Sequence, residues 1–130
     1  GFLGSPPMNF LQADLRREDD TLFAIGDAFK IAIPASKSKE LGQTSGHVTL
    51  GVRPSDLIYA PDAQDATAVD LQVKISEYIG AQSVLLCACG SSDVTVELKS
   101  ETPIALGETL RFAVRPEGIH LFDRKTELAL

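Results

Sequence analysis

Apolar and polar residues alternate along most of the chain. Such alternation is typical of strands with one buried face, because successive strand side chains point to opposite faces of a sheet. The clearest segment is 69–76, where every odd residue is apolar and every even residue is polar. Similar alternation predicts strands at 29–33, 48–52, 94–98 and 110–114. No window of a dozen residues has an apolar period of 3.6, so we expect an all-β protein of eight to ten short strands.

Glycine-led turns predict where these strands form hairpins. Glycine accepts the positive φ angles that tight hairpin loops require. The expected hairpins join 22–25 to 29–33 across Gly26-Asp27, 69–79 to 83–89 across Gly80-Ala81-Gln82, and 83–89 to the strand at 94 across 90–93. Surface loops are expected at 34–40 and 60–66, which are rich in Pro, Ser, Ala or Asp, and a solvated turn at Asp19-Asp20.

A heptapeptide occurs twice in the chain. Residues 51–57 are GVRPSDL, and residues 113–119, sixty-two positions later, are AVRPEGI. In each copy the proline, Pro54 or Pro116, restricts the preceding Arg53 or Arg115 to an extended conformation and suits the first position of a helical turn. We therefore expect a repeated strand-and-turn unit in a small, closed or partly open OB-like barrel.

The two copies differ in the length of chain that leads to them. From Leu41 to Arg53 there are three residues more than from Leu106 to Arg115. This difference predicts a bulge or a longer turn around 43–46.

Composition and net charge limit the classes of function that the chain can have. The chain has 130 residues, 44% of them apolar, which fits one compact domain. Its net charge of −6 repels a phosphate backbone, and the aromatic residues fall mostly at core positions, so nucleic acid is a poor partner. Cys87 and Cys89 would lie on one face of a strand, where bridging is unfavourable, and are expected to be reduced and buried.

Candidate chemistry is sparse. No glycine precedes a lysine, so a phosphate-binding Walker loop is excluded. His47 and His120 have no Cys or carboxylate grouping of metal-site spacing beside them and are interpreted as structural or surface histidines rather than metal ligands. No nucleophile elbow surrounds Ser5 or Ser83, so we expect no catalytic residue and no metal site in this fragment.

Four blocks in order carry a resemblance to a known family. They are GSPPMNFL at 4–11, LGVRP at 50–54, VKISEYIGAQ at 73–82 and RPEGIHLFD at 115–123. In this order they resemble the C-terminal regulatory segment of the ATPase subunits of maltose-type, carbohydrate-uptake ABC importers. That segment carries a TOBE module, an OB-like β-barrel region, and the resemblance runs from about Gly1 to the C-terminus.

The resemblance implies a function and an organisation. Residues 1–130 would form a regulatory and dimerisation domain, with two intertwined sub-barrels at about 10–60 and 67–123 as one interpretation. The ATPase domain would lie upstream, so ATP and Mg would bind there and this fragment would hold no cofactor. The implied partners are a second copy, the ATPase domain and the membrane subunits, at the cytoplasmic face of the cell membrane. The implied contact residues are Ser5, Pro6, Met8, Asn9 and Phe10.

Two alternatives remain open. Related TOBE modules bind oxyanions, so a small-ligand sensor for an oxyanion or a sugar is the second hypothesis, with Ser83, Lys74 and Thr95 as candidate ligands of an anion. A stand-alone OB-type nucleic-acid binder is the third, and the acidic charge disfavours it. The chain also departs from the family pattern at Ser55 and Asp56, where glutamate and histidine are common, and at Gly118, where a larger residue is frequent.

Overall fold

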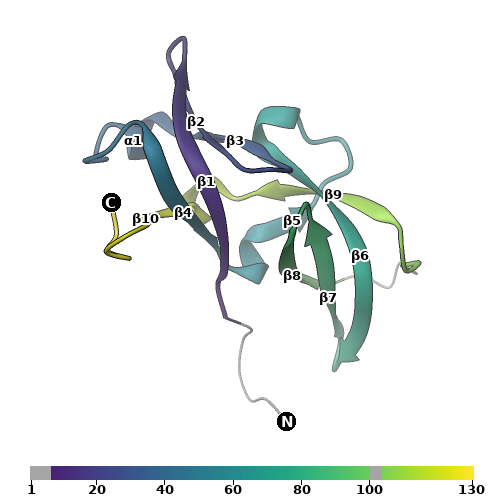
Figure 1. The fold of residues 1–130 in the computed structure, drawn as a ribbon. Coiled ribbons are helices and arrows are strands. Elements are labelled where there is room, and N and C mark those ends of the chain that lie inside the picture. The colour runs from purple at the N-terminus through teal and green to yellow at the C-terminus, as the bar shows by residue number, and fades with distance from the viewer. Residues whose placement is uncertain (1–6, 100–103) are drawn as a thin grey trace.

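Two antiparallel sheets make up the protein. The structure is a computed structural model that describes residues 7–99 and 104–130, and within these residues each sheet has five strands (Figure 1). Sheet A has the order β10-β4-β1-β2-β3 and sheet B the order β5-β9-β6-β7-β8. The strands are β1 Asn9–Glu18, β2 Thr21–Ile25, β3 Lys30–Ile33, β4 Gly46–Val52, β5 Leu57–Tyr59, β6 Ala68–Ile79, β7 Gln82–Cys89, β8 Ser92–Leu98, β9 Thr109–Val114 and β10 His120–Asp123.

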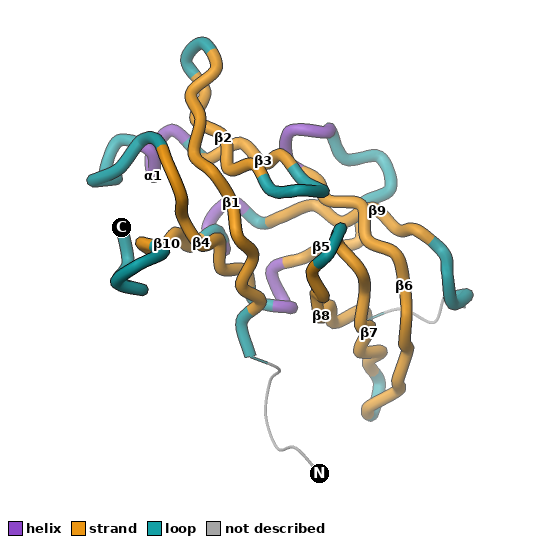
Figure 2. The backbone as a smooth tube through the Cα atoms, viewed as in Figure 1, coloured by secondary structure: helices purple, strands orange, loops and turns teal. Residues whose placement is uncertain are grey.

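Helical structure in the described part of the chain is limited to short pieces (Figure 2). They are α1 Ala35–Ser38 and the 3-10 turns η1 Pro54–Asp56, η2 Asp65–Thr67 and η3 Pro116–Gly118. The all-β prediction is thus confirmed. The expected loop at 34–40 was wrong in part, since α1 lies within it.

The inward-facing apolar residues of both sheets form one core. Leu22 and Leu50 of sheet A and Leu71, Leu85 and Phe112 of sheet B are each at most 2% exposed and belong to the same cluster. The edge strands β5 and β8 of sheet B contact each other, so this sheet curls into a half-barrel. The OB-like fold is confirmed.

The repeated heptapeptide is where the chain changes sheets. β4 of sheet A continues through η1 into β5 of sheet B, and β9 of sheet B continues through η3 into β10 of sheet A. The pairings are equivalent, because Ile58 pairs with Ala113 in one sheet and His120 pairs with Gly51 in the other. Each residue of the first copy and its counterpart sixty-two positions later thus make equivalent strand pairs, one in each sheet. This is a pseudo-two-fold arrangement of the two copies.

The two turns of the repeat pack directly on each other. Each is closed by the same bond, from the Asp56 N–H to the Arg53 carbonyl and from the Gly118 N–H to the Arg115 carbonyl, both at 2.9 Å. The Arg115 N–H then donates to the Asp56 carbonyl at 2.9 Å. A Cβ atom at Gly118 would lie 2.5 Å from Asp56 Cγ, so only glycine fits at this contact.

The three predicted hairpins are present. The β6–β7 and β7–β8 turns are tight, and their Gly80 and Gly90 have φ angles of +64° and +58°. The β2–β3 loop has four residues rather than two, and Gly26 does not adopt a positive φ. Glycine is required there for space, because a Cβ atom would lie 2.1 Å from Cε2 of Phe29.

One detail of the strand predictions was wrong, and the longer turn predicted as one alternative before β4 is present. A bulge at Lys74 shifts the β6–β7 register between Val73 and Ile75, so Ile75 is 49% exposed although its parity predicted a core position. The extra residues before β4 form a longer turn, and the β1–β4 pairing runs through without a register shift. Cys87 and Cys89 are free and buried, as expected.

Candidate functional site

The predicted contact block lies at the start of β1, the central strand of sheet A. Asn9 is only 8% exposed and faces inward. Its side-chain Nδ2 donates to the Thr95 carbonyl at 2.9 Å, and its Oδ1 accepts from the Thr95 N–H at 2.9 Å. The amide therefore occupies the open edge of β8 as a neighbouring strand would, and it ties sheet A to sheet B.

The two neighbours of Asn9 lie on the outer side of sheet A. The half-buried Met8 packs against Gly51, where a Cβ atom would lie 2.6 Å from Met8 Sδ. Phe10 is 60% exposed, and its ring meets the Phe122 ring edge-on at a centroid distance of 5.9 Å. Ser5 and Pro6 lie outside the described residues, so the block offers Met8 and Phe10 as outward contacts.

A shallow groove of about 390 Å³ runs beside this aromatic pair. Its lining residues are Phe10, Thr49, Phe122, Arg124 and Glu127. One nitrogen of Arg124, Nη2, donates to the carbonyls of Ala13 and Val48 at 2.8 and 2.9 Å, which fixes the side chain against the sheet. Aromatic residues were expected mostly in the core, and that expectation was wrong for Phe10 and for Tyr59 and Tyr78, which are 41% and 70% exposed. The signal was available, since Phe10 stands between inward-facing Asn9 and Leu11 in an alternating run.

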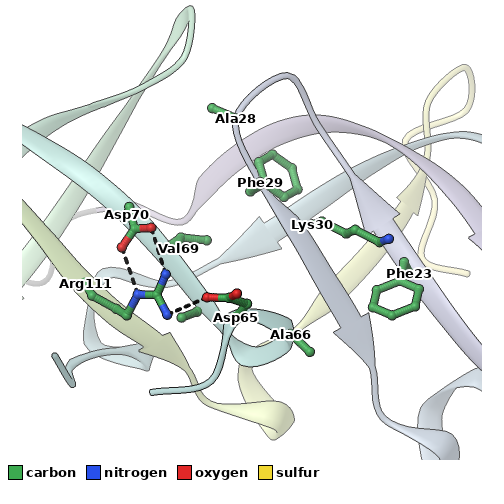
Figure 3. Close-up of a pocket in the computed structure, with 10 residues that line it drawn as sticks. Phe23, Ala28, Phe29, Lys30, Asp65, Ala66, Val69, Asp70 and Arg111 are labelled. Carbon is green, nitrogen blue, oxygen red and sulfur yellow. Dashed lines mark hydrogen bonds and ion pairs between the residues drawn. The ribbon is translucent and has the colours of Figure 1, made fainter. Parts of the chain in front are cut away.

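A second hollow, of about 440 Å³, lies between β3 and the η2–β6 segment (Figure 3). Arg111 of β9 dominates one wall. Its guanidinium donates to both carboxylate oxygens of Asp70, at 2.9 and 3.0 Å, and to Asp65 and the Ala63 carbonyl, at 2.8 Å each. These bonds lower the pKa of Asp70 and raise the pKa of Arg111, because each charged form is stabilised by its partner. The arginine is thus occupied in holding η2 against sheet B.

A third link joins the β2–β3 loop to the β7–β8 turn. Asp27 Oδ2 accepts hydrogen bonds from the Ser91 hydroxyl at 2.8 Å and from the Ser91 N–H at 3.1 Å. These two bonds lower the pKa of the Asp27 carboxyl, the hydroxyl bond having the larger effect. Together with Asn9, this carboxylate holds the two sheets as one body.

The arginines of the repeat have different partners. Arg115 pairs with Glu117 at 2.9 Å and lies 3.6 Å from Asp56. Arg53 Nη1 lies 3.4 Å from Nε2 of His120 on β10. Burial lowers the pKa of His120, and the charges of Lys37 and Arg53 lower it further.

The candidate oxyanion ligands do not converge. Ser83 faces inward on β7 and is 2% exposed, whereas Thr95 is at an outward position of β8. Lys74 lies in the β6 bulge and pairs with Asp93 at 3.1 Å. Since the three side chains do not share a face of the sheet, the structure does not assemble an anion site from them.

The part of the chain that the structure describes has no cluster of side chains typical of a metal-dependent catalytic site. No group of three His, Cys, Asp or Glu side chains that could hold a metal ion was found among residues 7–99 and 104–130. His47 is exposed on β4 and pairs with Asp14. No helix in the described part of the chain is long and apolar enough to span a bilayer.

Curated proteins similar to this chain are ATP-binding subunits of ABC transporters. The sn-glycerol-3-phosphate import ATP-binding protein UgpC of Ruegeria sp. (strain TM1040) is 31% identical over 128 residues, which cover 97% of this chain and 32% of that protein. The oligosaccharides import ATP-binding protein MsmX of Bacillus subtilis (strain 168) is 26% identical, over all of this chain and 36% of that protein. From the same organism, the ABC transporter ATP-binding protein YurJ is 27% identical, over all of this chain and 37% of its own length. The chain thus spans about a third of these relatives.

A solved structure shares the fold. The cytoplasmic molybdate-binding protein ModG superposes with a TM-score of 0.63 at 13% identity, over 87% of this chain and 94% of that one. At this identity the likeness shows the fold alone.

Two family models cover the sheets just described. The MalK OB fold domain matches residues 4–57, and the TOBE domain matches residues 50–122. The two matches overlap at the first Arg-Pro turn, where the chain passes from sheet A to sheet B. The predicted resemblance is therefore confirmed, and this chain belongs to the TOBE domain family, with a MalK-type OB fold at its N-terminal side.

Proposed function

We propose that this chain is the regulatory and dimerisation domain of an ABC importer ATP-binding subunit that serves the uptake of a sugar or a related solute. The observation that carries the proposal is the match of the whole chain to about a third of ATP-binding subunits such as UgpC and MsmX. A Walker loop was excluded from the sequence, so ATP and Mg would bind in another part of such a subunit.

The fold suits a scaffold role. A domain that holds two motor subunits in register must transmit force without deforming, and here three separate devices join the sheets. They are the crossing strands β5 and β10, the Asn9–Thr95 amide pair and the Asp27–Ser91 pair. Exposed apolar surface beside such a rigid frame favours a protein contact, and Phe10 provides it, with the half-buried Phe122 ring beside it.

The proposed partners follow from this role. A second copy of the subunit, its ATP-binding region and the membrane subunits of the transporter would contact the domain. The complex would lie at the cytoplasmic face of the membrane, where ATP is available.

A chimera tests the proposal. The chain would replace the matched third of Bacillus subtilis MsmX, and association would be followed by sedimentation velocity together with ATP hydrolysis. We expect the chimera to dimerise and Phe10→Ser to weaken the dimer about tenfold, because one large apolar contact is lost. Tyr78→Ser, at an aromatic site on the β6–β7 hairpin that is 70% exposed against 60% for Phe10, is the matched control. A chimera that stays monomeric, or equal effects of both substitutions, would contradict the proposal.

The shared fold with molybdate-binding ModG supports a second candidate, a small-ligand sensor. A ligand that binds only the folded state raises the unfolding temperature, and above its Kd the rise grows with the logarithm of the ligand concentration. Thermal unfolding with millimolar molybdate, sulfate and maltose therefore separates the candidates. A rise that grows with the concentration of one of them and is not seen with the other two favours the sensor, and unchanged midpoints with all three reject it for these ligands.

A further inference from the structure

Three basic side chains from distant parts of the chain meet beside the first Arg-Pro turn. Lys37 comes from α1, Arg53 from the end of β4 and His120 from the start of β10, elements that lie together at one side of the molecule (Figure 1). The Lys37 ammonium donates to the Ile119 carbonyl, and Arg53 Nη1 lies 3.4 Å from His120 Nε2. We call these three residues the basic cluster.

The two permanent cations of the cluster have no carboxylate partner. Within residues 7–99 and 104–130, neither Lys37 nor Arg53 forms an ion pair. The nearby Asp56 is shared with Arg115 instead. Like charges held together in this way repel each other unless an anion lies between them.

The surroundings of His120 favour its neutral form. An arginine N–H cannot accept, so the contact with Arg53 requires His120 Nε2 to act as the acceptor, in the neutral ring with its proton on Nδ1. Burial and the charges of Lys37 and Arg53 oppose protonation of this ring, and only the Asp56 charge favours it. A ligand that supplied negative charge would reverse the balance.

A hollow is available beside the cluster. It measures about 180 Å³, and both Lys37 and His120 line it, together with Glu40 and the apolar Leu41, Leu121 and Leu130. A single tetrahedral anion with a small organic substituent fits such a volume. Lys37 and the titratable His120 line the hollow, and Arg53 lies beside the imidazole, 3.4 Å from its Nε2. Together these groups match a dianion better than a carboxylate, which carries one charge.

We propose that Lys37, Arg53 and His120 bind the phosphate group of a small phosphorylated ligand at the junction of α1, β4 and β10. The site differs from the oxyanion ligands Ser83, Lys74 and Thr95 and does not depend on dimerisation. Lys37 and Arg53 supply fixed charge, and His120 gains a proton when the anion binds. Glu40, on the rim of the hollow, opposes binding by charge repulsion.

The two histidines of the chain make a direct test possible. The ring resonances of His47 and His120 would be followed by NMR between pH 5 and 8, with and without inorganic phosphate or glycerol 2-phosphate, at constant ionic strength. By linkage, an anion that binds the protonated ring more tightly must raise its pKa. We expect the pKa of His120 to rise saturably and that of His47 to stay constant. If both histidines respond alike, or neither responds, the site is rejected.

Variants add a second readout by calorimetric titration. Lys37→Gln and Arg53→Gln should each weaken phosphate binding about tenfold, since each removes one charge-assisted contact. Lys39→Gln, the same charge change on an exposed residue just after α1, should leave it unchanged, and Glu40→Gln should tighten it. Equal weakening by Lys39→Gln would show non-specific attraction and overturn the proposal.

Stronger binding of glycerol 2-phosphate than of inorganic phosphate would show that the organic substituent is also bound, and the reverse order would contradict a phosphorylated ligand.

Discussion

At the scale of single residues, the position of Asn9 requires a side chain that both donates and accepts a hydrogen bond. Its amide satisfies both the N–H and the carbonyl of Thr95 at the edge of β8, where no strand does so. Asn9→Ala would leave the part-buried N–H and carbonyl of Thr95 without partners, and we expect the free energy of unfolding to fall by about 2 kcal/mol. Urea titration would measure the change. Gln12→Ala, an exposed site on the same strand, is the control, and an equal loss there would refute the role of the amide.

Asp27 gives a prediction about pH. Its pKa is lowered in the folded protein by the two bonds from Ser91, so its contribution is present above the ordinary value of 3.8 and is lost as the pH falls through the lower, folded value. Asp27→Asn should therefore reduce the loss of stability between about pH 4 and pH 2. Unfolding midpoints measured across this range test it. Asp62→Asn, in an exposed loop, is the control, and an unchanged acid profile in Asp27→Asn would contradict the assignment.

Residue patterns were predictive where one face of a strand was apolar. The strands at 48–52, 94–98 and 110–114 were found because each alternates cleanly. β1 was not predicted as a strand, although its burial alternates, because Asn9 and Ala13 occupy inward positions and weaken the apolar signal. An inward asparagine makes sense only once its distant partner, Thr95, is known.

At the scale of elements, the two Arg-Pro turns depend on each other. Gly118 lies against Asp56 so closely that a methyl group would meet Cγ at 2.5 Å. Gly118→Ala should therefore destabilise the protein by about 1–3 kcal/mol, the usual cost of overpacking. Gly42→Ala is a matched control, since a Cβ atom there would have no neighbour within 4 Å. Chemical denaturation of both variants measures the difference, and a neutral Gly118→Ala would show that the turns can separate.

The η2 segment depends on one arginine. Arg111 bonds to Asp65 and to the Ala63 carbonyl while its other nitrogens bond to Asp70. Arg111→Gln should free this segment, and amide exchange at 63–67 should become faster while exchange in β7 stays unchanged. Exchange that accelerates equally in both places would instead indicate global destabilisation.

Element boundaries were less predictable than element types. The bulge at Lys74 reverses the faces of β6, and no residue before it departs from the alternating pattern. Its cause lies in tertiary structure, since β9 ends its pairing at Gln72, the Val73 N–H and carbonyl bond to the chain just before β9, and β6 continues with β7. The candidate contact block came from resemblance, whereas the basic cluster could not be predicted, because its members are separated by up to 83 positions and only the strand exchange brings them together.

At the scale of the whole molecule, the exchange of β5 and β10 decides how the protein unfolds. Each sheet contains a strand from the opposite half of the chain, so neither sheet can open fully without disturbing the other. A division into sub-barrels at about 10–60 and 67–123 predicts separate unfolding, whereas the strand exchange predicts one cooperative transition.

Amide exchange and thiol labelling distinguish these outcomes. The slowest amides of β1 and β4 should show the same opening free energy as those of β6 and β7, equal to that of global unfolding.

Cys87 and Cys89 report on the opening of sheet B independently of amide exchange. Burial raises the pKa of Cys87 to about 11, and it raises the pKa of Cys89 as well. At pH 8 roughly a thousandth of Cys87 would therefore be thiolate even if the side chain were reachable. Alkylation should then proceed only through global opening and match the slowest exchange of sheet A. If sheet B labels at a lower opening free energy than the β1 and β4 amides, the two halves unfold as separate units.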